Sequence, residues 1–210
     1  MPSTPIKASL ALAALFLVSA PALALADEAP PPAHFGDSGQ FALHLSEGLS
    51  ASYGDIISGP EIQADYFVAP HVSLGLMAGA NWYSGSAISG SSSSSNFVFR
   101  AGPRLGYDIP LTDYVSWWPQ IGVDYRSEST GSSTLSTGGT TVTVANTNTT
   151  SAFAFTAVAP ILIHPTRGFF IGAGPAFYTE ISNSTSSGGA SFDNPKVTSV
   201  GLMATIGGAI

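Results

Sequence analysis

From Gln40 onward, apolar side chains alternate with polar or small ones along segments of roughly ten residues. A period of two is typical of β-strands whose two faces meet different environments. The alternation is clearest over 72–82, 97–109 and 115–126, and weaker over 40–49, 61–68, 152–163, 169–181 and 197–210. The sequence therefore predicts eight β-strands.

The links between these segments alternate between short and long. The short links are 69–71, 110–113 and 164–168, and the long links are 50–60, 84–96, 127–151 and 182–196. Barrels of bacterial outer membranes combine an even number of strands with short periplasmic turns and long extracellular loops. We therefore predict an all-β fold, an eight-stranded antiparallel up-and-down transmembrane β-barrel over 40–210.

The more polar parity of the strands indicates which face points inward. It carries Arg100, Arg104, Asp108, Gln120, Asp124 and Arg126. An arginine facing lipid near the bilayer midplane would cost about 2–4 kcal/mol, whereas in the lumen it can pair with Asp108 and Asp124. An eight-stranded barrel has an interior just wide enough for its own side chains. We expect a polar plug held by charge-assisted hydrogen bonds, with a narrow ion path as the alternative.

Aromatic residues of the opposite parity gather toward both ends of the predicted strands. Trp82, Phe97, Tyr125 and Phe153 fall toward the long loops, and Tyr107, Trp117 and Phe169 fall toward the short turns. Two such bands are typical of the two membrane interfaces. A general preference of aromatic residues for strands is the alternative explanation.

Some positions depart from regular strands. Pro103, Pro119, Pro160 and Pro175 lie inside predicted strands, where we expect bulges or bends because proline cannot donate to a sheet ladder. Apolar residues occupy both parities of 152–163, which leaves the facing of this strand open. Within 127–151, the pair at 138–139 (Gly-Gly) between two Thr-rich runs predicts a hairpin that prolongs strands five and six.

The N-terminal 26 residues match an export signal. Lys7 precedes a short apolar core at 10–18, and an Ala-x-Ala cleavage site occupies 24–26. Residues 27–39, which contain three consecutive prolines and no periodicity, are predicted to be a disordered leader. The sequence thus predicts a signal peptide at 1–26, export through the inner membrane, and a barrel from residue 40.

Composition narrows the classes of function. Only 9% of the residues are charged. After removal of the signal, the chain has five basic and 13 acidic residues, which gives a net charge of −8. Nucleic-acid binding, which requires basic patches, is therefore not expected. The absence of cysteine removes thiol nucleophiles and cysteine-based metal sites.

Candidate chemistry is sparse. Catalysis needs a nucleophile and a base within reach, and only His44 of the four histidines lies in a predicted strand. Acidic residues near the long loops (Asp124, Glu128, Glu180) suggest a solvated rim, with a hard-cation site as the alternative. We therefore predict no enzyme, no catalytic residues, no metal and no cofactor.

The chain resembles the OmpA- and OmpW-like group of small outer-membrane β-barrels. The resemblance covers nearly all of 40–210 and includes the stretches RAGPRLGY at 100–107 and FIGAGP at 170–175. It implies outer-membrane lipid and lipopolysaccharide as surroundings and the barrel-assembly machinery as a partner during insertion. Members of the group commonly end in an aromatic residue, whereas this sequence ends in Ile210.

Three functions are compatible with these features. We expect first a structural or surface-interaction role carried by the long extracellular loops, with an unidentified extracellular partner. A porin-like narrow channel for ions or for small or apolar solutes is the alternative that the OmpW-like side of the resemblance allows. A lipid-modifying outer-membrane enzyme comes third.

Overall fold

The computed structural model describes residues 34–49, 60–86, 92–131, 133–137, 140–144 and 148–210. The signal peptide predicted at 1–26 lies outside the described residues. In the described part, 14 strands join into one sheet. They are β1 (Phe41–Gly48), β2 (Glu61–Ala69), β3 (Val72–Ser86), β4 (Ser92–Tyr107), β5 (Ile109–Thr112), β6 (Val115–Trp117), β7 (Gln120–Thr130), β8 (Ser133–Thr137), β9 (Thr140–Val144), β10 (Asn148–Val158), β11 (Ile161–Thr166), β12 (Phe169–Ser187), β13 (Ala190–Asp193) and β14 (Thr198–Ala209). No helix in these ranges is long and apolar enough to cross a membrane.

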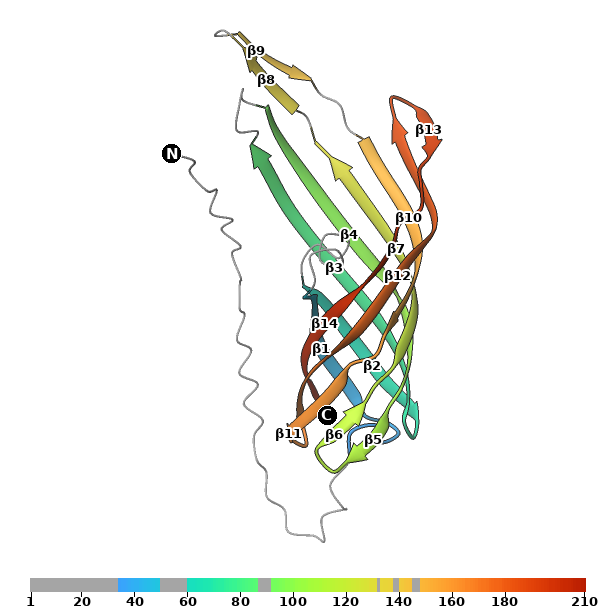
Figure 1. Cartoon of the computed structure of the whole chain (residues 1–210). Helices are drawn as coiled ribbons and strands as arrows, with labels where there is room; N and C mark the ends of the chain where they lie inside the picture. The colour runs from blue at the N-terminus through green and yellow to red at the C-terminus, as the bar shows by residue number, and fades with distance from the viewer. Residues whose placement is uncertain (1–33, 50–59, 87–91, 132, 138–139, 145–147) are drawn as a thin grey trace. The chain divides into compact units, whose positions relative to one another are not determined.

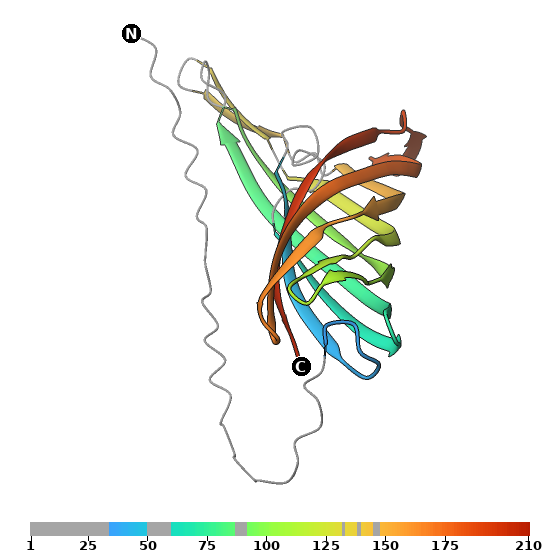
Figure 2. The ribbon, with the colours of Figure 1, turned by 60° about the horizontal axis from the view of Figure 1, so that its bottom comes forward.

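The sheet closes into an antiparallel barrel. Each strand pairs with its neighbour in the order β1, β2, β3, β4, β7, β10, β12 and β14, and β14 pairs with β1 to close the ring (Figures 1 and 2). The short strands β6 and β11 continue the lines of β7 and β10 past a break. Within the described residues, each of these eight strands has a paired neighbour on both sides, which removes the usual liability of an exposed edge strand. The ring of eight strands predicted from the sequence is confirmed.

Side chains alternate between the inside and the outside of this ring. In β1, Ala42, His44 and Ser46 are buried, while the alternate residues Phe41, Leu43 and Leu45 are exposed. The same alternation settles the facing of the predicted strand 152–163, because Val158 and Leu162 are both buried inside. The outer wall is thus apolar, and the interior holds both polar and aromatic side chains.

Strand breaks occur at prolines. Trp118 and Pro119 separate β6 from β7, and Ala159 and Pro160 separate β10 from β11. Backbone hydrogen bonds still join the neighbouring strands at these breaks. Trp118 N donates to Pro160 O at 3.0 Å, and Ala159 N donates to Pro175 O at 3.0 Å. The expectation that prolines mark irregularities is confirmed at these two breaks, which lie side by side on neighbouring strands.

Paired strands continue into most of the predicted long loops. β3 and β4 stay paired as far as Ser86 and Ser93, and β8 pairs with β9 as the predicted hairpin. β8 also pairs with the start of β4, and β13 pairs with the end of β12 (top of Figure 1). We call this side the long-loop end and the side with β5, β6 and the β11–β12 turn the short-turn end. The predicted loop 50–60 lies almost wholly outside the described residues.

The leader differs from its prediction over its described part. Residues 34–39 form two turns, and they are tied to the barrel by backbone bonds from Gly39 N to Phe67 O at 2.8 Å and from His71 N to Gly36 O at 2.7 Å. Periodicity gives no signal for so short a segment, because its order comes from contacts with distant residues. The remainder of the leader, 27–33, lies outside the described residues.

Candidate functional site: the barrel interior

A cluster of four charged side chains occupies the middle of the lumen. Arg100 Nη1 lies 2.6 Å from Glu61 Oε1, and Arg100 Nη2 contacts Asp124 Oδ2. Arg104 Nη2 lies 3.9 Å from Glu61 Oε2 and 3.7 Å from Asp124 Oδ2. All four residues are buried, and the two positive charges equal the two negative ones. Such a balance is what lets buried charges persist away from water.

Glycines on the intervening strand make this cluster possible. Glu61 on β2 and Arg100 on β4 both stand opposite Gly79 of β3, which has no side chain to separate them. Arg104 likewise stands opposite Gly75 of β3 on one side and Gly122 of β7 on the other. The guanidinium of Arg100 also lies over the ring of Tyr178, 5.3 Å from its centroid. The small residues of the inward parity therefore give the long side chains their room.

The interior brings together only part of the predicted polar set. Arg100, Arg104 and Asp124 meet in the cluster, and Gln120 is buried in the lumen as well. Arg126 stands opposite Arg100 on the neighbouring strand but pairs with two other acids, with Nη2 at 2.7 Å from Glu128 Oε2 and Nη1 at 3.5 Å from Glu180 Oε1. The predicted pairing of arginine with Asp108 is wrong, because the basic group beside Asp108 is His71, with Nδ1 at 3.6 Å from Oδ2.

Two of the predicted rim acids are not solvated. Asp124 is fully buried in the central cluster, and Glu180 is 3% exposed. Glu180 accepts hydrogen bonds from Asn183 Nδ2 at 2.8 Å and from the backbone N of Val197 at 2.9 Å. It therefore ties the returning chain of β14 to β12. No group of three or more His, Asp or Glu side chains in the described ranges is placed to hold a metal ion.

A second buried group joins β14, β1 and β2. His44 Nε2 lies 2.9 Å from Asp65 Oδ2, and His44 Nδ1 lies 2.9 Å from Thr205 Oγ1. The order hydroxyl, imidazole and carboxylate is that of a nucleophile activated by a base. Thr205 is 5% exposed, however, and none of the three residues lines either depression of the surface described below. We read the group as a polar tie between strands.

Aromatic side chains fill the lumen at the short-turn end. Buried Phe67, Trp118, Leu162 and Phe170 cluster with Ala42 and Ala209, and Phe35 of the leader packs against them. The ring centroid of Phe35 lies 5.2 Å from Phe67, 5.2 Å from Trp118, 5.1 Å from Phe170 and 4.9 Å from His164. The leader thus closes this end of the barrel with an aromatic cap, which sequence reasoning missed.

Replacement of Phe35 by Leu tests the cap. Leucine keeps an apolar side chain but loses the ring geometry of these contacts. One aromatic pair is worth about 0.5–1.5 kcal/mol, so we expect a loss of at least about 1 kcal/mol in unfolding free energy. The near-ultraviolet circular dichroism of the neighbouring Trp118 should weaken together with stability. Phe192→Leu, on exposed β13, is the matched control and should change neither quantity. An unaltered dichroism spectrum for Phe35→Leu would contradict the cap.

The seven predicted interface aromatics all lie on the outer wall. Their exposed fractions run from 37% for Tyr125 to 74% for Trp82, and the others are Phe97, Tyr107, Trp117, Phe153 and Phe169. Trp82 stands opposite Phe97 on paired strands, and the rings of Tyr125 and Phe153 lie 5.3 Å apart. Their role at membrane interfaces stays a prediction.

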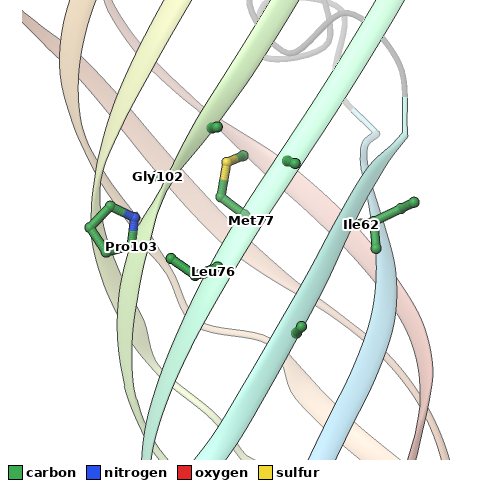
Figure 3. Close-up of a pocket in the computed structure, with 8 residues that line it drawn as sticks. Ile62, Leu76, Met77, Gly102 and Pro103 are labelled. Atoms are coloured by element: carbon green, nitrogen blue, oxygen red, sulfur yellow. The ribbon is translucent and has the colours of Figure 1, made fainter.

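An apolar depression of about 490 Å³ lies on the outer wall over β2, β3 and β4 (Figure 3). Ile62, Leu76 and Pro103 line it together with small residues that include Gly102. Leu76 and Pro103 are register partners, and Pro103 falls in a gap of the β4–β7 ladder. Its lining continues the apolar character of the surrounding wall, so it is a surface that hydrocarbon fits.

Comparison with known proteins places these features in a family. A family model described as "Outer membrane protein beta-barrel domain" matches residues 10–206. No curated protein matches the chain.

Among solved structures, the chain is similar to Ail, the attachment invasion locus protein of Yersinia pestis, at 12% identity and a TM-score of 0.37, covering 82% of this chain and 99% of that chain. It is similar to Neisserial surface protein A at 11% identity and a TM-score of 0.42, covering 81% and 91%. A major outer membrane protein from Thermus thermophilus has 12% identity and a TM-score of 0.48, covering 81% and 97%.

Proposed function

The chain belongs to the outer membrane protein beta-barrel domain family, and we propose on that premise that it acts at the cell surface through the strands beyond its long-loop end. It is a β-barrel of the bacterial outer membrane, and its exposed apolar wall supports the proposal that this wall faces lipid. In the proposal, the short turns face the periplasm and the long-loop end faces outward, as is usual for such barrels. Export by the predicted signal and insertion by the barrel-assembly machinery belong to the same proposal.

The sheet that rises from β3, β4, β8 and β9 supports a surface-interaction role. Within the described residues β9 pairs with β8 alone, so its other edge is open (Figure 1). The sequence of β9, Thr140–Val144, contains no proline and no charged residue, the devices that commonly protect an edge. An open edge of this kind can accept an extended peptide as an added strand. We propose strand addition at β9 as the mode of interaction.

A fluorescent octapeptide of alternating Val and Thr tests this mode. Vesicles that contain the whole chain should bind the peptide and raise its fluorescence anisotropy. Vesicles that contain a chain in which Gly-Ser-Gly replaces residues 133–144 should not bind it. The matched control is the same peptide N-methylated at alternate residues, which keeps the side chains but cannot donate to a ladder. Equal binding of both peptides, or binding to the shortened chain, would reject strand addition. Protease cleavage of β8–β9 on intact cells checks that this sheet faces outward.

We propose that the lumen is closed rather than conducting. Two features support this, because the central cluster fills the interior with ion-paired side chains and the aromatic cap fills its short-turn end with packed apolar ones. In planar bilayers the whole chain is therefore expected to leave the ionic current at the baseline of protein-free membranes. A steady current that changes when Arg100 and Arg104 are both neutralised would instead favour the narrow channel.

A further inference from the structure

A pocket of about 350 Å³ opens at the short-turn end of the barrel, opposite to the proposed interaction sheet. Three segments converge on it, namely the leader turns, the β5–β6 hairpin and the β11–β12 turn. This volume lies within the usual range of small-molecule sites, about 300–1,000 Å³. The side chains around the pocket therefore indicate what kind of molecule it can hold.

The charged side chains of the lining are balanced. Asp113 on the β5–β6 hairpin and Arg167 on the β11–β12 turn are both exposed at the pocket. Asp108 is fully buried beneath them and is ion-paired with His71, whose Nδ1 lies 3.6 Å from Oδ2, so this carboxylate is engaged within the chain. One exposed carboxylate and one exposed guanidinium cancel, so the pocket favours neither a cationic nor an anionic ligand.

Uncharged polar groups complete the mouth of the pocket. Thr112, Tyr114 and Thr166 carry hydroxyl groups, His34 carries an imidazole, and all four residues are exposed. A hydroxyl group can donate and accept at the same time. Thr112 Oγ1, for example, accepts from Tyr114 N at 3.2 Å and keeps its own O–H to donate. A ligand that matches this mouth therefore needs several groups that both donate and accept, as hydroxyl groups do.

Apolar surface lies among these polar groups. Phe35, Pro110 and Pro165 line the pocket, and Tyr114 beside them is 67% exposed. The backbone of Tyr114 is held on both sides, since its N donates to Thr112 Oγ1 at 3.2 Å and its O accepts from His164 N at 2.8 Å. An aromatic side chain presented from a fixed backbone loses little freedom when it binds. The ring of Tyr114 therefore offers a flat apolar face to a ligand.

We propose that this pocket binds a neutral saccharide, one pyranose face of which packs on Tyr114 while its hydroxyl groups bond to Asp113 and Arg167. A pyranose carries hydroxyl groups around its edge and C–H groups on its faces, so it matches both kinds of lining. A plain hydrocarbon would leave the polar groups without partners. The binding is independent of the surface-interaction role, since pocket and interaction sheet lie at opposite ends of the barrel. Only access from the periplasm depends on the orientation proposed above.

The whole chain, in micelles of a detergent without a sugar headgroup, can be titrated with cellobiose and followed by saturation-transfer NMR. We expect saturable binding, and we expect sorbitol, which has hydroxyl groups but no ring face, to bind at least about tenfold more weakly. Tyr114→Ala should weaken cellobiose binding by a similar factor, whereas Tyr114→Phe should keep most of it. Leu111→Ala, an exposed position of the same hairpin outside the lining, is the matched control and should bind as the unaltered chain does.

Each outcome has a definite meaning. Equal binding by Tyr114→Ala and the unaltered chain, or equal binding of sorbitol and cellobiose, would overturn the proposal, as would the absence of saturable cellobiose binding. An equal loss in Leu111→Ala would also overturn it, because the shape of the hairpin and not the ring of Tyr114 would then be responsible. Heat-modifiable migration on gels verifies that each variant is folded. Sedimentation with insoluble cellulose separates two sources of the saccharide, a free sugar and a glycan strand.

Discussion

Replacement of Arg100 by Met is expected to lower the unfolding free energy of the barrel by about 3–5 kcal/mol, the usual cost of removing one partner from a buried ion pair. Arg100 is the one side chain of the central cluster that contacts Glu61 and Asp124 closely at the same time. Without it, two buried carboxylates would share Arg104, whose nearest oxygens lie 3.7 and 3.9 Å away. Reversible denaturation in micelles, followed by intrinsic fluorescence, measures the change.

Further variants distinguish loss of charge balance from loss of packing. Arg167→Met removes an exposed arginine and should change stability by less than about 0.5 kcal/mol. Adding Asp124→Asn to Arg100→Met removes one of the stranded carboxylates, so the double variant should be more stable than the sum of the single effects predicts. Strict additivity, or a loss for Arg100→Met no larger than that for Arg167→Met, would show that the cluster contributes no net stability.

The facing of the strands could be predicted from the sequence because it depends on a local property. Alternation of side chains along a strand has a period of two, so Leu74 and Leu105 on one parity and Arg100 and Arg104 on the other separate without knowledge of any partner strand. The alternation of short and long links then indicates that successive strands run up and down as neighbours in the barrel. The structure confirms the predicted facing, because Leu74 and Leu105 are exposed and the two arginines are buried.

The partners of the inward side chains could not be predicted, because they depend on register. Glu61 reaches Arg100 only since both stand opposite Gly79, and long links do not determine how far one strand slides past the next. The sequence did indicate that Glu61 has the inward parity of its strand, and that acidic side chains must balance the two buried arginines. For the same reason Asp108, which shares the arginine parity, finds His71 rather than an arginine.

The aromatic cap illustrates a different limit. Phe67, Trp118 and Phe170 have inward parity close to strand ends, and this signal was present in the sequence. Phe35 sits in a proline-rich segment without periodicity, and its position is determined only by the rings that surround it. Local pattern cannot identify a residue whose order comes wholly from tertiary contacts.

The second large effect is expected at Gly102, where replacement by Ala should cost about 3 kcal/mol, toward the upper end for overpacking of a closely packed site. A Cβ atom at this position would meet the carbonyl oxygen of Val123, and it would lie 2.7 Å from Asp124 Oδ1 and 2.8 Å from Asp124 Cα. The backbone of β7 cannot rotate away as a flexible side chain would. Displacing Asp124 would also disturb its contact with Arg100, which adds to the cost.

Two further glycine variants make this prediction specific. Gly174→Ala should behave like Gly102→Ala, because Gly174 also precedes a proline and its Cβ would meet Ala159 O and lie 2.6 Å from Pro160 Cα. Gly168→Ala is the control, since its nearest neighbour, Ala209 O, would be 3.3 Å away, a contact that a small shift can relieve. Denaturation midpoints of the three variants in micelles provide the comparison. If Gly102→Ala proved as stable as Gly168→Ala, close approach of β4 and β7 would not be what requires glycine at this position.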